Sequence, residues 1–105
     1  MTKYVLNAFS LNMLGTFPAS INIEEVTLEQ ARVLVEGAES SVGHADTAAV
    51  MSSMLGYTVP ANRTTVALAA GETALVGQYK GPRLEEGTVE LPEGATIQWL
   101  LVTIK

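Results

Sequence analysis

The sequence predicts an α/β fold in which a mixed five-stranded sheet is flanked by two or more helices. Short runs of apolar or alternating residues, which are typical of strands, recur along the chain. Two other stretches have the spacing of amphipathic helices, and glycine or proline separates most of these segments. With 105 residues, 48% of them hydrophobic, the chain has the size of one domain, 1–105, with one core.

The first half of the chain contains two predicted strands and one helix. Residues 3–7 (KYVLN) form a short apolar run, and residues 20–24 (SINIE) alternate between apolar and polar side chains. Thr27 followed by Gln30 has the spacing of a capping box, in which each side chain bonds the other residue's backbone. A helix is therefore expected over residues 27–36.

A second helix is predicted over residues 45–55, which are rich in Ala, Met and Leu and are followed by Gly56 as a C-terminal stop. Residues 64–68 then alternate β-branched and small side chains. An Ala-Gly turn at 70–71 separates them from residues 73–79, so these two segments are expected to pair as a hairpin.

The last quarter of the chain combines a long loop with the most apolar strand. Residues 80–94 contain two prolines, three glycines and several charges, which predicts a loop with at most a short helical turn. Residues 96–104 are apolar at both even and odd positions around Trp99. That pattern predicts a central strand buried on both faces of the sheet.

Composition excludes several classes of function. Without cysteine the chain has no disulfide, no thiolate metal site and no catalytic thiol. A net charge of −5 with only six Lys and Arg argues against long nucleic acids, which are bound through many phosphate contacts. The chain has no apolar run long enough to span a membrane and does not begin like a signal peptide, so a cytoplasmic protein is expected.

His44 is the only histidine, and its setting favours a role in catalysis. A lone histidine is commonly structural or exposed. Here, however, Gly43 precedes it and a helix follows, whose first amides lack partners and can hold an anion. A phosphate bound there would favour the imidazolium, which can donate a proton to the 5′-oxygen that leaves when a phosphodiester is cut.

Two further groups of polar residues have alternative interpretations. Residues 83–87 (RLEEG) fit a solvated charged turn, but Arg83 also suits a phosphate clamp, and Glu86 suits a ribose hydroxyl or a catalytic partner. Asn7, Ser10 and Asn12 follow the first predicted strand, where α/β sheets place ligand-binding loops. The same side chains also suit the capping of a turn.

The residues also indicate which kind of phosphodiester chemistry is available. One histidine, no cysteine and no clustered pair of aspartates argue against a zinc or two-metal nuclease site, and no cofactor-binding motif is present. Cleavage then needs another nucleophile. The ribose 2′-hydroxyl of an RNA-like substrate supplies one internally and leaves a 2′,3′-cyclic phosphate.

Four segments in register along the whole chain carry a family resemblance: YVLNAFSLNML at 4–14, SVGHADTAAVMSSMLG at 41–56, NR at 62–63 and RLEEG at 83–87. Together they resemble the viral anti-CRISPR ring nucleases directed against type III systems. The resemblance implies a homodimer that binds cyclic tetra-adenylate between its subunits. It also implies metal-independent cleavage to linear di-adenylate with a 2′,3′-cyclic phosphate.

The resemblance also assigns site residues. The catalytic residues it implies are His44, Arg83 and Glu86, with no metal ligand and no cofactor. The ligand-binding residues it implies are Asn7, Ser10, Asn12, Arg63 and Gln78. Residues 88–96 are short and contain Pro and Gly, so any segment that covers the ligand in relatives can differ here.

Two other functions remain open from the sequence. A non-catalytic sponge would use the same arginines to sequester a cyclic nucleotide without cutting it. A structural or protein-interaction module would bind no nucleotide tightly. Ligand recovery after incubation separates the first from a nuclease, and a thermal shift with cyclic oligonucleotides separates the second.

Overall fold

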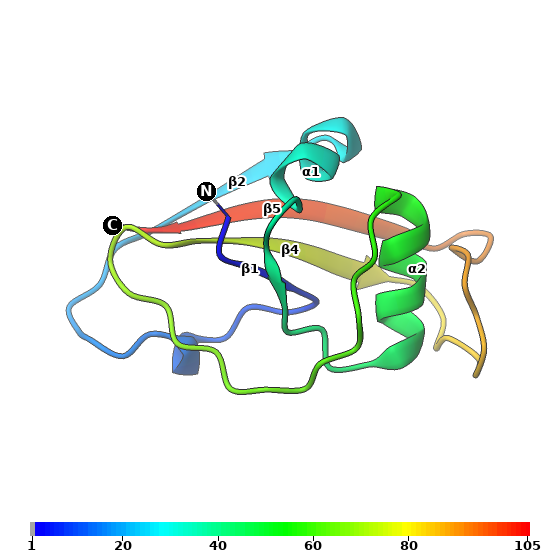
Figure 1. The fold of residues 1–105 in the computed structure, drawn as a ribbon, viewed down its shortest axis with the longest axis horizontal. Coiled ribbons are helices and arrows are strands. Elements are labelled where there is room, and N and C mark those ends of the chain that lie inside the picture. Colours follow the sequence, from blue (N-terminus) through cyan, green and yellow to red (C-terminus); the bar gives the residue numbers. More distant parts are fainter. Residues whose placement is uncertain (1) are drawn as a thin grey trace.

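The computed structural model describes residues 2–105, and Figure 1 shows how the elements are arranged. The elements are β1 (Tyr4–Leu6), the 3-10 helix η1 (Leu11–Met13), β2 (Ile21–Val26), α1 (Leu28–Leu34), β3 (Glu39–Ser40), α2 (Ala45–Leu55), β4 (Thr73–Lys80) and β5 (Thr96–Ile104). The strands form one sheet in the order β2-β5-β4-β1-β3. The predicted class, a mixed five-stranded sheet with two α-helices, is confirmed.

Strand directions divide the sheet into a parallel and an antiparallel part. β1 lies between β3 and β4 and is parallel to both, whereas β5 is antiparallel to both β2 and β4. The carboxyl ends of β1, β3 and β4 therefore meet at one edge of the sheet. Loops that follow these three strands are brought together there, as in other α/β sheets.

The helices pack on one face of the sheet and form its larger core. Side chains of Val5, Leu75 and Trp99 from three strands belong to one buried cluster with Ala31 of α1 and Met51 of α2. Burial of such apolar surface is the main force that holds the layers together. This packing fixes α2 across the sheet near the carboxyl ends of the parallel strands (Figure 1).

Contact between strand and helix is so close that one strand position has no room for a side chain. A Cβ atom on Gly77 of β4 would lie 2.7 Å from the Trp99 ring and 2.9 Å from the methyl group of Met51. Such distances are well inside van der Waals contact, so glycine is required for this packing.

Loops cover part of the opposite face, and they account for the largest error in the predicted fold. Residues 64–68 form no strand, because Leu68 makes only an isolated bridge with Leu14 and no ladder with β4. Val66 and Leu68 are buried against the sheet. The alternating pattern of residues 64–68 therefore reflects burial and not pairing in a strand. The hairpin partner of β4 is β5, and the fifth strand is β3, whose two residues include no apolar side chain.

The last strand agrees with its prediction in part, because it has buried residues on both faces of the sheet. β5 lies inside the sheet between β2 and β4, but the central strand is β4. Trp99 and Val102 are buried, whereas Leu100 and Leu101 are only partly covered. Leu101 borders a surface hollow beside α1, because this short helix does not extend over the whole of that face.

Helix starts and stops agree closely with the sequence prediction. Thr27 accepts a hydrogen bond from the Gln30 N–H at 3.1 Å, and Gln30 accepts one from the Thr27 N–H at 2.8 Å, which completes the predicted capping box. α1 ends at Leu34, two residues before its predicted end. α2 has its predicted bounds, and Gly56, with φ of 64°, follows it as the C-cap. No helix formed by residues 2–105 is long and apolar enough to cross a bilayer.

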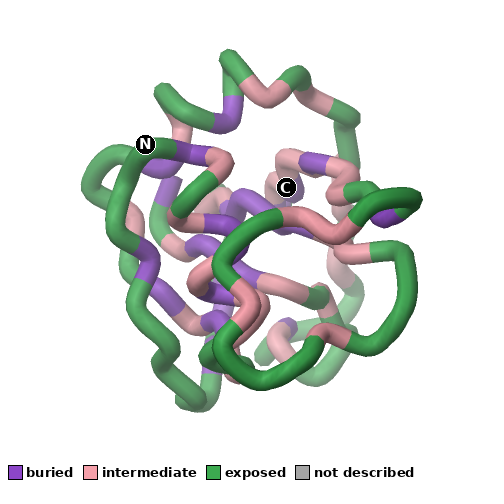
Figure 2. Tube along the Cα trace, turned by 90° about the vertical axis from the view of Figure 1, so that its right-hand side faces the viewer, coloured by how far each residue is buried: buried purple, intermediate pink, exposed green. Residues whose placement is uncertain are grey.

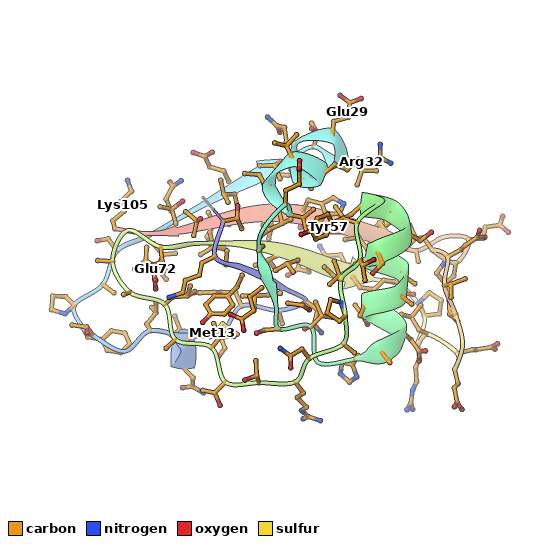
Figure 3. The ribbon with its side chains drawn as sticks, in the orientation of Figure 1. Met13, Glu29, Arg32, Tyr57, Glu72 and Lys105 are labelled. Carbon is orange, nitrogen blue, oxygen red and sulfur yellow. The ribbon has the colours of Figure 1, made fainter. Side chains whose placement is uncertain are left out.

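Two polar contacts hold the carboxyl end of α2 against the α1 region. The Arg32 Nε–H donates to the Met54 carbonyl at 3.1 Å, and the Gly37 N–H donates to the Tyr57 hydroxyl at 3.2 Å. Figure 3 shows Arg32 on α1 and Tyr57 just beyond α2, where the two helices meet. A guanidinium at this end also complements the negative pole of α2. With its carboxyl end held, the direction of α2 and the position of its first turn are defined.

Candidate functional site

Three chain segments meet at the carboxyl edge of the parallel strands. Asn7 follows β1, residues 41–44 follow β3, and residues 81–83 follow β4. Asn7 Oδ1 accepts a hydrogen bond from the Gly43 N–H at 3.5 Å, which joins the first two segments. The edge of the sheet thus places Asn7 directly beside the residue that precedes His44.

His44 is the N-cap residue of α2, and its side chain is exposed. Its backbone is extended, with φ of −125° and ψ of 128°, and its carbonyl accepts the first helical bond from Ala48 at 2.9 Å. The imidazole makes no capping bond to the helix. Because the first amides of a helix have no partner within it, the start of α2 remains open to an anion.

His44 and Arg83 border the same surface hollow, although 38 residues separate them in the sequence. This hollow has a volume of about 510 Å³, and Tyr79 and Gly81 also line it. An adjoining hollow of about 670 Å³ is lined by Glu86 together with Arg83. The structure therefore brings His44, Arg83 and Glu86 to one surface region. Figure 2 faces the end of the molecule where α2 and the loop after β4 lie, and most of the backbone nearest the viewer there is exposed.

Arg83 is a cation without an internal partner. It is exposed and forms no ion pair or hydrogen bond with the described residues. The ion pair found within residues 2–105 joins Lys3 to Glu72, near the amino end of β4. There a hydrogen bond from Lys3 lowers the pKa of the Glu72 carboxyl below its ordinary value and raises the pKa of Lys3. Arg83 is therefore free to meet an external anion such as a phosphate.

Arg63 lies beside the segment that leads into His44. A Cβ atom on Gly43 would be 3.6 Å from Cγ of Arg63. The preceding residue, Asn62, fixes this arrangement: its N–H donates to the Val42 carbonyl at 2.8 Å, and its side-chain amide donates to the Ser40 carbonyl at 2.8 Å. The aliphatic part of a second arginine side chain thus lies at the same edge of the sheet.

Gln78 lies near this edge but on the other face of the sheet. It lies on β4 between Gly77 and Tyr79, so its side chain points to the sheet face opposite α2. Its amide donates to Gln98 Oε1 at 3.2 Å, and the Gln98 amide donates to Glu25 at 3.2 Å. Gln78 therefore belongs to a polar row across the sheet and does not face His44 directly.

Ser10 and Asn12 lie away from His44 within one chain. Both are exposed, and Ser10 caps η1 by accepting a hydrogen bond from the Asn12 N–H at 3.3 Å. Figure 1 shows η1 separated from α2 along the long axis of the molecule. Ser10 thus has the turn-capping role that the sequence left open. Within one chain, Ser10 and Asn12 are too far from α2 for direct contact with a small ligand at His44.

The structure adds residues that the sequence reasoning missed. Asp46 and Leu84 line both hollows, and the Tyr79 hydroxyl donates to the Pro82 carbonyl at 2.6 Å. Asp46 had a detectable signal, since an acidic residue in the first turn of a helix favours the helix. Its position beside Arg83 depends on tertiary structure alone. Within residues 2–105, no group of three or more His, Asp and Glu side chains is placed to hold a metal ion.

Comparison with known proteins shows that the chain is similar to proteins of archaeal viruses. A profile of the STIV B116-like family matches residues 3–98. The solved structure of B116 of Sulfolobus turreted icosahedral virus superposes with a TM-score of 0.83 at 28% identity, covering 98% of this chain and 99% of B116.

Two curated relatives are named as uncharacterized viral proteins. Protein 26 of Sulfolobus islandicus filamentous virus (isolate Iceland/Hveragerdi) is 34% identical over 82% of this chain and 74% of its own length. ORF117 of Acidianus two-tailed virus is 36% identical over 68% of this chain, which spans 63% of that protein.

Proposed function

The chain belongs to the STIV B116-like family, and we propose that it is a ring nuclease that cuts cyclic tetra-adenylate. The products are linear di-adenylates that carry a 2′,3′-cyclic phosphate. Removal of this second messenger would switch off the effector nucleases of type III CRISPR defence. The viral origin of the relatives supports an anti-CRISPR role in the cytoplasm of an infected prokaryotic cell.

The observation that carries this proposal is the hollow shared by His44 and Arg83. A phosphodiester there would lie near the uncapped amides of α2, a proton donor and a guanidinium. Each of these groups suits an anionic substrate for an independent physical reason. Arg63 adds positive charge at the same edge of the sheet.

The proposed chemistry is an internal transesterification. The ribose 2′-oxygen attacks the neighbouring phosphorus and loses its proton to solvent, and the bond from phosphorus to the 5′-oxygen breaks. His44 donates a proton to this 5′-oxygen and later regains one from solvent, so the protons balance and no water is consumed. Arg83 stabilises the charge on the phosphate oxygens, and Glu86 orients a ribose hydroxyl or a catalytic partner.

A homodimer follows from the symmetry of the substrate. A two-fold axis through a four-nucleotide ring would place two copies of His44 at opposite phosphodiesters, so that two cuts give two identical dinucleotides. A ring held between two chains also offers contacts to Asn7 and Arg63 of each chain, which lie beside Gly43. Gln78 points to the opposite face of the sheet, so its contact would involve a part of the ring away from His44. The distance of η1 from α2 within one chain suits contacts of Ser10 and Asn12 that come from the partner. Light scattering coupled to size-exclusion chromatography measures the oligomeric state directly.

The test is chromatography of cyclic tetra-adenylate after incubation with wild type and with His44→Ala, both in EDTA. We expect wild type to release di-adenylate with a 2′,3′-cyclic phosphate, and His44→Ala to bind the ring but cut it at least about 10²-fold more slowly. Equal cutting by the variant would exclude His44 as the acid.

The same experiment separates the other functions. Intact ring recovered from wild type would identify a sponge. A thermal-shift assay tests binding itself, because a ligand at about 100 times its dissociation constant adds about 2.7 kcal/mol to stability. Unchanged melting with a panel of cyclic oligonucleotides would instead favour a structural or interaction module.

A further inference from the structure

Residues 85–88 form a tight turn that presents Glu86. The Glu85 carbonyl accepts two hydrogen bonds from Thr88, one from its N–H at 3.1 Å and one from its hydroxyl at 2.6 Å. Gly87 has φ of 86°, as the third residue of a type II turn requires. Glu86 is exposed at the second position, and its side chain makes no hydrogen bond or ion pair with the described residues. The local sequence therefore defines the shape of the turn but not its place on the molecule.

One hydrogen bond places this turn on α2. The Gly87 N–H donates to Asp46 Oδ1 at 3.2 Å, and Asp46 lies in the first turn of α2, two residues after His44. Among the described hydrogen bonds of residues 83–94, this is the one that reaches another part of the chain. The base of the loop is fixed separately, because the Tyr79 hydroxyl holds the Pro82 carbonyl. Beyond that base, the hydrogen bond to Asp46 is the anchor that holds the turn against α2.

We propose that Asp46 is the positioning residue of this site, which sets Arg83 and Glu86 relative to His44. The assignment rests on the proposed nuclease function. Asp46 and Arg83 both border the two hollows, so Asp46 lies in the same surface region as His44 and Glu86. A carboxylate suits this place, because its hydrogen bond is charge-assisted and the positive end of the helix stabilises its charge.

The expected consequence is a loss of rate rather than of affinity. Misplacement of a catalytic group by about 1 Å can cost about 10²-fold in rate even when the substrate still binds. Without the anchor, the turn would sample several positions over α2. Arg83 would still attract phosphate, but it would stabilise the reacting geometry for a smaller fraction of the time.

The test compares Asp46→Ala with Asp46→Asn, whose amide oxygen keeps an acceptor for the Gly87 N–H. Asp46→Glu keeps the charge in the first helical turn but moves the carboxylate by one methylene. A matched control, Glu90→Gln, removes one negative charge from the same loop. The Glu90 side chain is exposed and makes no hydrogen bond or ion pair with any residue in 2–105. Amide exchange at Gly87 is measured by NMR, and cutting of cyclic tetra-adenylate is measured in single turnover.

We expect Asp46→Ala to speed exchange at Gly87 about tenfold or more and to slow single-turnover cutting about tenfold to a hundredfold. Asp46→Asn restores both quantities to within about threefold of wild type, and Glu90→Gln leaves both unchanged. Asp46→Glu retains the stability of α2 and loses part of the rate. The affinity for uncut ring, measured in the His44→Ala background, stays within about threefold in all variants.

Three outcomes would overturn the assignment. Unchanged exchange at Gly87 in Asp46→Ala means that the bond does not hold the turn. Faster exchange with unchanged cutting means that the turn is held for a reason other than catalysis. A wild type that cuts no ring refutes the nuclease function and the catalytic reason for positioning. Exchange at Gly87 still reports on the anchor by itself in that case.

Discussion

The two helices of this small domain begin in opposite ways. At the start of α1, Thr27 and Gln30 exchange hydrogen bonds and satisfy two backbone N–H groups. At the start of α2, His44 occupies the equivalent position and its side chain caps nothing. Histidine is absent from the group of strongly preferred N-cap residues, for which replacement by a non-capping residue costs about 1 kcal/mol. The better capped helix is the one that lies away from the candidate site.

This difference indicates where the fold has been optimised for stability and where it has not. α2 is the longer helix and carries more of the buried core, so it tolerates a poor N-cap. Its first turn borders the hollow that Arg83 also lines. We interpret the exchange of a stabilising cap for an imidazole as a mark of function, in agreement with the general trade-off between stability and activity.

A good cap at the start of α2 should have opposite effects on stability and on activity. In His44→Ser, the hydroxyl can accept a hydrogen bond from an amide of the first turn. We expect the free energy of unfolding to rise by about 1 kcal/mol. The same change removes the proposed acid, so cutting of cyclic tetra-adenylate should fall at least about 10²-fold. Denaturant unfolding and single-turnover assays measure the two effects on one protein.

His44→Ala serves as the control, because it removes the acid without adding a cap. It should match His44→Ser in activity and should not match its gain in stability. A Ser variant that is less stable than wild type would show that the imidazole supports the start of α2 after all. The start of α2 could then no longer be described as less stable than it could be with a capping residue.

The opposite change at α1 should affect stability alone. Thr27→Ala removes the hydroxyl that accepts from the Gln30 N–H, so the free energy of unfolding should fall by about 1 kcal/mol. Cutting should be unchanged, because α1 lines neither of the hollows beside His44. Chemical denaturation and the same ring assay check both statements, and slower cutting by folded Thr27→Ala would contradict the division of roles.

Local signals explain what could be predicted of the fold. The capping box of α1, the bounds of α2 and the glycine at its end were all readable, because each depends on residues within one or two turns. Residues 64–68 were misread, since a buried alternating segment looks the same whether it pairs in a ladder or covers a sheet as a loop. β3 was missed because its pairing with β1 depends on the tertiary structure and not on its own two residues.

The candidate site follows the same division. His44 was singled out because a glycine, a histidine and a helix start are adjacent in sequence. The approach of Arg83 and Glu86 to it could be suggested only by resemblance, since the hollow depends on strand order. Asp46 was overlooked although it lies two residues from His44, because its partner Gly87 is 41 residues away.

The smallest expected effect concerns surface charge far from both helix starts. Lys3 and Glu72 form an exposed ion pair, which lowers the pKa of Glu72 and raises that of Lys3. A carboxyl with a lowered folded-state pKa contributes stability at neutral pH and loses it as the pH falls through that value. The lysine contribution is lost only at high pH, as the pH rises through its raised pKa. We therefore expect Glu72→Gln to melt slightly below wild type at pH 7, with the difference vanishing in acid.

Melting curves of both proteins between pH 7 and pH 3 measure this difference, and added salt should reduce it at pH 7. Cutting by Glu72→Gln at pH 7 should equal that of wild type. A shift as large as that from Thr27→Ala would contradict the small contribution expected of an exposed pair. It would also mean that surface charge rivals helix capping in this domain, so that a change in stability at His44 could no longer be assigned to the cap alone.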